Sequence, residues 1–177
     1  ERDILKQRTI KLFDQFCQDY EDEIQNLGGI GFFLGGIGPD GHIAFNVKGS
    51  AHHSHTRLTN INYETQAAAA SDLGGIEIVR KKAVITIGLH TITQNPETVA
   101  IIIAAGQSKS EQVVNAVEKD PSITYPATSL QKLKNARFFV TQSATSLLTL
   151  SEASIKQLYK KKILPANYYE KLLLSGA

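Results

Sequence analysis

The chain carries an aspartate and a histidine two residues apart, Asp40 and His42, inside a glycine-rich stretch. A carboxylate accepts hydrogen bonds from an imidazole, and an imidazole exchanges a proton near neutral pH. The surrounding glycines let backbone N–H groups come close to a ligand. This spacing favours a site for acid–base chemistry. In the alternative interpretation, Asp40 only shapes a turn before Gly41, and His42 is a helix cap or a hydrogen-bonded core residue.

Lys109 is a second candidate for binding chemistry. It follows an apolar run at 98–104 and lies in the first turn of a helix predicted over 108–117. The N–H groups at the start of a helix, together with the helix dipole, favour an anion. A lysine adds a point charge that suits a phosphate. The alternative is a solvated lysine at the start of a helix.

Alternating strands and helices have to position these residues. Apolar runs predict buried strands at 30–34 and 98–104 and further strands at 83–87 and 136–140, with a strand or hairpin arm at 55–61. Helical spacing and glycine or proline breakers predict helices at 3–27, 63–73, 108–117, 151–160 and 166–174, and short helical turns at 88–94 and 129–133. Strands separated by helices predict one α/β domain over residues 1–177 with a parallel sheet. In such sheets ligands bind at the carboxyl ends of the strands, which is where the stretch around Asp40 and His42 falls.

Composition limits the classes of function. The chain has 177 residues, 42% hydrophobic and 20% charged, which is typical of an ordinary globular domain. A formal net charge of +2 is too small to indicate a nucleic-acid or membrane partner. One cysteine, Cys17, excludes an internal disulfide framework and fits a reducing compartment, so we expect a cytoplasmic protein. No carboxylate or cysteine lies near His52, His53 and His55 to complete a tetrahedral metal site, and we expect no metal.

Residues 35–46, GGIGPDGHIAFN, resemble the signature loop of the glucosamine-6-phosphate deaminases, also called isomerases. The related 6-phosphogluconolactonases share the core of this loop, but there the histidine is usually followed by Thr-Ala-Ser-Leu-Phe-Pro. Here Ile43-Ala44-Phe45-Asn46 has the deaminase form. The segments 54–57, 83–88 and 106–109 resemble later family segments in the same order. The resemblance implies a modified Rossmann-type fold, of which this chain is expected to be the C-terminal portion, and a hexose phosphate as substrate.

The family's reaction is an aldose–ketose isomerisation coupled to loss of ammonia, and the resemblance implies no metal or other cofactor. It implies that His42 opens the pyranose ring, that Asp40 holds and tunes this histidine, and that Lys109 binds the phosphate. Further substrate contacts are implied at Gly36, Ile37 and Ala44. The family's base for the C2 proton is an aspartate in a segment expected upstream of residue 1. We therefore expect this chain alone to be a poor catalyst.

Three positions depart from the family pattern. Val47 stands where the family has a glutamate that works with the Asp–His pair, and valine cannot accept a proton. Ser71 falls near the position of a phosphate-binding arginine, and His90 replaces a usual glycine. These departures predict a diverged branch with an altered substrate, a reduced rate or no deaminase activity.

Three functions remain open at this point. The first is a glucosamine-6-phosphate deaminase/isomerase-like enzyme. The second is a sugar-phosphate hydrolase of the 6-phosphogluconolactonase type. The third is a non-catalytic module that binds sugar phosphate, which Val47 and Ser71 favour. We also expect a homo-oligomer, because an incomplete sheet exposes an edge or a face.

Overall fold

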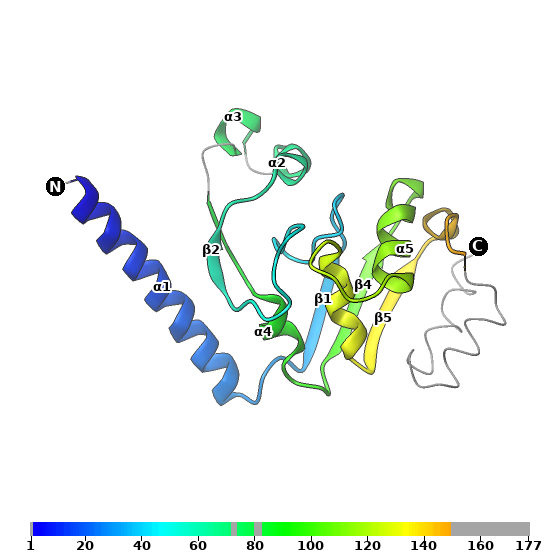
Figure 1. The fold of residues 1–177 in the computed structure, drawn as a ribbon, viewed down its shortest axis with the longest axis horizontal. Coiled ribbons are helices and arrows are strands. Elements are labelled where there is room, and N and C mark those ends of the chain that lie inside the picture. Colours follow the sequence, from blue (N-terminus) through cyan, green and yellow to red (C-terminus); the bar gives the residue numbers. More distant parts are fainter. Residues whose placement is uncertain (1, 72–73, 80–82, 150–177) are drawn as a thin grey trace.

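Three parallel strands form the sheet that positions the loop around Asp40 and His42 (Figure 1). The computed structural model describes residues 2–71, 74–79 and 83–149. The strands are β1 (Phe32–Gly36), β4 (Val99–Ala104) and β5 (Asn135–Val140), in the order β1-β4-β5. The register pairs Phe32 with Val99 and Ile102 with Phe138. The predicted α/β class with a parallel sheet is therefore confirmed.

One face of this sheet is covered by short helices. They are α4 (Leu89–Thr93), α5 (Ser110–Glu118) and the 3₁₀ helix η2 (Pro126–Lys132). Apolar side chains of these helices meet alternate residues of the strands in one core, which contains Leu89, Ile92, Val113, Leu130, Ala100, Ile102 and Phe138. This one-sided core holds the carboxyl ends of the strands, and the loops that follow them, in place.

The opposite face of the sheet keeps large apolar side chains exposed. The side chains of Phe32, Leu34 and Ile103 retain 60%, 58% and 54% of their accessible surface. The prediction that 30–34 and 98–104 are buried strands is therefore wrong for Phe32, Leu34 and Ile103, and β1 also begins two residues later than predicted. A continuous apolar run is the sequence pattern of a strand that is covered on both faces, and this is why burial was predicted. In the structure, the described helices pack on one face only.

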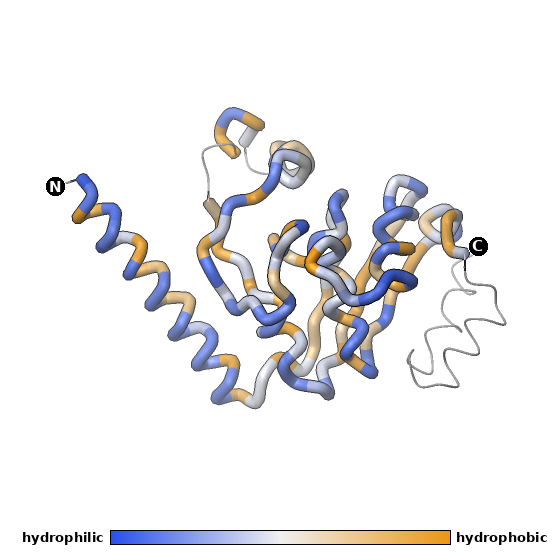
Figure 2. The backbone as a smooth tube through the Cα atoms, in the orientation of Figure 1, coloured by the Kyte–Doolittle hydropathy of each residue, from blue (hydrophilic) through white to orange (hydrophobic). Residues whose placement is uncertain are grey.

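The longest element, α1 (Arg2–Asn26), extends away from the sheet (Figure 1). Its C-terminal half contacts the rest of the molecule through three buried residues, Cys17, Glu21 and Ile24. Gly28 and Gly29 end the helix with positive φ angles, and the Gly29 N–H donates to the Ile24 carbonyl, the pattern of a Schellman cap. Hydrophilic and hydrophobic residues alternate along the whole helix (Figure 2), and several apolar side chains towards its free end are exposed. The prediction of a helix over 3–27 is confirmed.

A two-stranded antiparallel ribbon lies between α1 and the sheet. It pairs β2 (Arg57–Thr59) with β3 (Val84–Thr86), and this pairing confirms the hairpin arm and the strand expected at 55–61 and 83–87. The connection between them contains α2 (Tyr63–Ala69) and α3 (Ile76–Val79). The helix predicted over 63–73 ends earlier, at Ala69, and α3 was not predicted because four residues are too few for a periodic pattern.

The remaining predicted helices lie in the C-terminal part of the chain, after β4. The helix expected at 108–117 consists of the 3₁₀ turn η1 (Gln107–Lys109) followed by α5. A further 3₁₀ helix, η3 (Gln142–Thr145), was not predicted. The helices predicted at 151–160 and 166–174 lie outside the described residues. Among the ranges 2–71, 74–79 and 83–149, no helix combines the length and apolar character needed to cross a membrane.

Candidate active site

The loop after β1 brings Asp40 and His42 into direct contact. Asp40 Oδ1 lies 2.5 Å from His42 Nδ1 and 3.4 Å from the His42 backbone nitrogen. Two backbone hydrogen bonds close the loop, from Gly38 N to His42 O and from Gly41 N to Gly38 O. Gly41 has a φ of 82°, a conformation that a side chain rarely tolerates. The sequence spacing therefore folds into an aspartate–histidine pair, as expected.

The glycine at position 38 is required by the histidine ring. A Cβ atom there would lie 2.0 to 2.2 Å from three ring atoms of His42, well inside any van der Waals contact. The imidazole therefore packs directly over the backbone of the loop. This contact gives Gly38 a specific role in placing the ring, in addition to the flexibility expected of glycine-rich loops.

Asp40 is held as a carboxylate anion. Burial alone raises its pKa, but hydrogen bonds from His42 and Asn62, the charge of His42 and a backbone N–H from Lys48 lower the pKa far below its usual value. The Asn62 Nδ2 to Asp40 Oδ2 distance is 2.7 Å, and the Lys48 N to Oδ2 distance is 3.3 Å. A carboxylate accepts hydrogen bonds only, so the short contact requires His42 Nδ1 to carry the hydrogen. His42 Nε2 is then the nitrogen that accepts a proton.

The N-terminus of α2 contributes two residues that the sequence did not single out. Asn62 caps α2, with its Oδ1 accepting from Thr65 N at 3.0 Å, while its Nδ2 donates to Asp40. The hydroxyl of Thr65, a fully buried residue, lies 3.2 Å from His42 Nδ1. An asparagine just before a predicted helix is an N-cap signal that could have identified this position, but its reach to Asp40 requires the folded chain.

Lys109, in the turn that follows β4, reaches the same loop after β1. Its Nζ donates to the carbonyl of Ile37 at 2.8 Å, across 72 positions of sequence. Lys109 follows β4, as predicted, but it lies in the 3₁₀ turn η1 just before α5, and not in the first turn of the α-helix. The turn is preceded by Gly106, which has a φ of 89°. An ammonium group has three hydrogens, so those not directed at Ile37 are available to an anion.

The other predicted contacts of the loop have different environments. The side chain of Ile37 is buried in the core, so any contact it makes with a ligand must come from its backbone. Gly36 is exposed at the end of β1. Ala44 has a φ of 51°, and it is the one non-glycine residue with positive φ in the described chain. Such a conformation is unfavourable for alanine and is common at functional sites.

Asn46 ties the loop to β2 and to the segment that follows β3. It is fully buried, and its Nδ2 donates to the carbonyls of Ile43 and Ile87 at 3.0 and 2.7 Å. Its Oδ1 accepts from Arg57 at 2.8 Å, and Arg57 also donates to Ser50 at 3.2 Å. The asparagine of the signature loop is therefore a structural connection. This explains why the loop, β2 and the segment after β3 stay together.

A cleft of about 520 Å³ lies beside the aspartate. Pro39, Asp40 and Gly41 line it together with Gln112 and Tyr125, and Gln112 Nε2 donates to the Pro39 carbonyl at 2.6 Å. Lys48 and Asn62 also line the cleft. The His42 ring is not part of this lining, although its side chain keeps 13% of its exposure. The cleft therefore reaches the dyad through Asp40.

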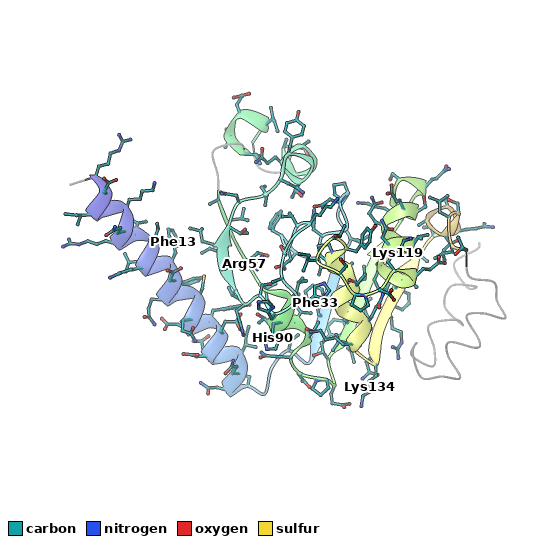
Figure 3. The ribbon with its side chains drawn as sticks, viewed as in Figure 1. Phe13, Phe33, Arg57, His90, Lys119 and Lys134 are labelled. Carbon is teal, nitrogen blue, oxygen red and sulfur yellow. The ribbon has the colours of Figure 1, made fainter. Side chains whose placement is uncertain are left out.

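The positions that depart from the family pattern lie in different places. Val47 is half-buried in the loop after Asn46, and Ser71 follows the end of α2. His90 lies on α4 (Figure 3). Its ring meets the ring of His55 edge-on, with the ring centroids 4.8 Å apart. The structure thus places His90 against Ser54 and His55, in the segment that precedes β2, and not against Asp40 or His42.

The histidines at 52, 53 and 55 do not converge. His52 Nε2 lies 3.1 Å from the Ser122 carbonyl, and His55 Nδ1 lies 3.2 Å from Glu21 Oε2. In the part of the chain that the structure describes, no three His, Cys, Asp or Glu side chains are grouped to hold a metal ion.

The fold and the loop define the class of protein. A strand of a parallel sheet ends in a glycine-rich turn with an aspartate–histidine pair, and Lys109, from the turn that follows the neighbouring strand β4, reaches that glycine-rich turn. Such α/β domains bind their ligands at this edge of the sheet. No family model matches the chain.

The similar proteins are consistent in name. Glucosamine-6-phosphate deaminase of Borreliella afzelii (strain PKo) is 37% identical over 129 residues, which are 73% of this chain and 47% of that protein. Glucosamine-6-phosphate isomerase of Candida albicans (strain SC5314 / ATCC MYA-2876) is 35% identical over 137 residues, 76% of this chain and 54% of that protein. The solved structure of a monomeric glucosamine-6-phosphate deaminase of the NagB superfamily matches with a TM-score of 0.68 and 32% identity, over 76% of this chain and 54% of that one.

The chain belongs to the glucosamine-6-phosphate deaminase/isomerase family, as the resemblance of its loop indicated. It spans about half the length of the curated relatives that it matches.

Proposed function

We propose that this site binds a hexose 6-phosphate and takes part in converting glucosamine 6-phosphate to fructose 6-phosphate and ammonia. The observation that carries this proposal is the 2.5 Å contact between Asp40 and His42, which leaves His42 Nε2 as the proton acceptor. The names of the similar proteins support the choice of reaction. Overall, the substrate and one water give fructose 6-phosphate and ammonia.

His42 is the group that opens the sugar ring in this proposal. Its Nε2 takes the proton of the anomeric hydroxyl and returns a proton to the ring oxygen as the bond to C1 breaks. The imidazolium that forms in between lies against the anionic Asp40, which stabilises it. The open-chain aldehyde is the form from which a proton moves from C2 to C1 and ammonia leaves C2.

Lys109 and the turn before α5 are the proposed phosphate contact. The Nζ atom is fixed by the Ile37 carbonyl and has further hydrogens to donate. Backbone N–H groups at the start of a helix add favourable charge for an anion. The exposed backbone at Gly36 and the unusual conformation at Ala44 place further polar backbone groups on the same loop.

The test is ammonia release from glucosamine 6-phosphate by the full chain, with His42→Ala as the variant. We expect slow turnover by the wild type, in keeping with the poor catalyst expected of this chain alone, and a loss of about 10²- to 10⁴-fold in the variant, the usual contribution of general acid–base catalysis. A folded wild type that binds the sugar phosphate without turnover would favour the non-catalytic module, which Val47 supports. Hydrolysis of a 6-phosphogluconolactone would favour the lactonase, and either result would overturn the deaminase proposal.

We also infer that the protein self-associates and acts in the cytoplasm. The exposed apolar face of the sheet, with Phe32, Leu34 and Ile103, supports association because water is an unfavourable environment for such a surface. The buried, unpaired thiol of Cys17 is consistent with a reducing compartment.

A further inference from the structure

Asp40 has four hydrogen-bond donors, and one of them comes from outside its own loop. Three belong to the loop, namely the backbone and ring nitrogens of His42 and the backbone nitrogen of Lys48. The fourth is Asn62 Nδ2 at 2.7 Å, a shorter contact than either backbone contact. The carboxylate is therefore tied to α2 as well as to its own loop.

The orientation of the Asn62 amide is determined by its two partners. Its Oδ1 accepts from Thr65 N, an otherwise free N–H at the start of α2, and its Nδ2 donates to Asp40. A reversed amide would oppose an oxygen to the carboxylate and an NH₂ group to the helix N–H. Both contacts would then be repulsive, so the helix cap and the contact with Asp40 require the same orientation.

Thr65 extends the connection from α2 to the histidine. It is 1% exposed, and its Oγ1 lies 3.2 Å from His42 Nδ1. Because the Nδ1 hydrogen points at Asp40 Oδ1, the threonine oxygen is positioned as a second, weaker acceptor of that hydrogen. Two residues of one helical turn thus contact the two members of the dyad.

We propose that Asn62 and Thr65 are positioning residues that keep the Asp40–His42 pair in its working orientation and tie it to the N-terminus of α2. This inference rests on the proposed function for its catalytic meaning, because positioning matters for a reaction that the pair performs. Neither residue needs to touch the substrate. Asn62 orients the carboxylate, the carboxylate and Thr65 orient the ring, and Nε2 is thereby directed to one place.

The variants separate positioning from folding. Asn62→Ser keeps a good N-cap but is too short to donate to Asp40, and Asn62→Asp keeps the cap while opposing a carboxylate to Asp40. Thr65→Val removes the hydroxyl at nearly constant shape, and Thr65→Ser restores it. Asn60→Ser serves as the matched control, because Asn60 is exposed and lies two positions before the cap.

The first readout does not depend on activity. The nitrogen chemical shifts of the His42 ring, measured by NMR on the full chain, report which nitrogen carries the hydrogen. We expect one tautomer, with the hydrogen on Nδ1, in the wild type, in Thr65→Ser and in Asn60→Ser. We expect mixed tautomers or a shifted titration of His42 in Asn62→Ser, Asn62→Asp and Thr65→Val.

The second readout is kinetic. We expect kcat to fall about 10- to 100-fold in Asn62→Asp and Thr65→Val with KM changed little, since a misdirected base slows the chemical step. The acid limb of the pH–rate profile should move to higher pH in Asn62→Asp, because a second carboxylate favours the protonated ring. Thr65→Ser should recover most of the rate.

The outcomes distinguish this inference from the proposed function. If the wild type shows no turnover but the His42 spectra change as expected, the deaminase proposal fails and the positioning role stands. If folded Asn62→Ser and Thr65→Val have the same His42 spectra and titration as the wild type, the positioning inference is wrong, whatever the activity.

Discussion

At the scale of single residues, the imidazole of His42 and the bare backbone of Gly38 form one unit. The ring occupies the space that a side chain at position 38 would need, with ring atoms about 2 Å from such a Cβ. The position of the His42 ring therefore depends on the absence of a side chain at Gly38. Sequence reasoning identified the glycine-rich loop, but it assigned the glycines to backbone approach and not to accommodating the ring.

The first prediction concerns this contact. Gly38→Ala should destabilise the protein by about 1–3 kcal/mol, because the new methyl group forces the ring or the loop to move. In the double variant with His42→Ala, the cost should be well below the sum of the two single effects. Urea unfolding measures both.

Gly31→Ala is the control for the loop prediction. Its Cβ would meet no atom within 4 Å, so a change within about 0.5 kcal/mol is expected. Additive effects in the double variant would show that the ring does not depend on Gly38.

At the scale of elements, α1 is attached to the ribbon and α4 through a buried carboxylate. Glu21 Oε1 accepts from Thr56 N at 2.8 Å and from Thr91 Oγ1 at 2.6 Å, and Oε2 lies 3.2 Å from His55 Nδ1. Burial alone raises the pKa of Glu21, but these hydrogen bonds outweigh it and lower the pKa. An anion with this many donors is a strong anchor for a helix whose other half is exposed.

The second prediction tests this anchor. Glu21→Gln should lower the free energy of unfolding by about 2–4 kcal/mol, because the amide presents donors to groups that themselves donate. Hydrogen exchange along α1 should quicken most in the half that packs on the ribbon. Glu23→Gln, on the exposed side of the same helix, should change stability by less than about 0.5 kcal/mol. Equal effects of the two variants would contradict the anchoring role.

The third prediction concerns acid conditions at the same junction. Burial lowers the pKa of His90, and the neighbouring His55 and Lys132 lower it further. Below the ordinary histidine pKa of about 6.5, His90 therefore binds a proton in the unfolded chain but stays neutral in the folded chain. The free energy of unfolding is therefore highest above that pH, and it falls as the pH decreases towards the lowered pKa of His90 in the folded chain.

Urea unfolding at about pH 7.5 and about pH 5.5 measures this loss. We expect the decrease to be smaller in His90→Gln, which has no proton to gain. His52 also has a pKa lowered mainly by burial, so part of the decrease should remain. A His90→Gln variant that loses stability as steeply as the wild type would assign the pH dependence elsewhere.

At the scale of the whole molecule, the described chain is a sheet with one covered face. Alternate residues of β1 and β4 enter the core, and those between them point away from it. The resulting surface combines Phe32, Leu34 and Ile103 with the outer strand β1, which contains no charged residue or proline. Natural edge strands usually carry charged residues or proline, which protect them against association.

The fourth prediction tests self-association through this face. Leu34→Lys should lower the average mass of the protein in sedimentation experiments over a dilution series, with a small effect on stability because the side chain is already exposed. Ile123→Lys is the matched control, as its side chain is similarly exposed in a loop outside the sheet. A wild type that stays monomeric at all concentrations would overturn the proposed self-association.

Local patterns were sufficient for much of this protein. Helix periodicity and the glycine pair predicted α1 and its end, and apolar runs predicted the strands of the parallel sheet. The spacing of Asp40 and His42 predicted their contact, since two residues across a tight turn have few alternatives. These features depend on neighbours in sequence, which is why the sequence determined them by itself.

Only the tertiary structure decided which distant groups meet. Asn62 reaches Asp40 across 22 positions, and Lys109 reaches Ile37 across 72. The covered face of the sheet was likewise a matter of packing, because an apolar run has the same pattern whether a helix covers one side or two. Such contacts depend on where whole elements come to rest, and that is determined by the burial of many side chains together and not by the identity of any one of them.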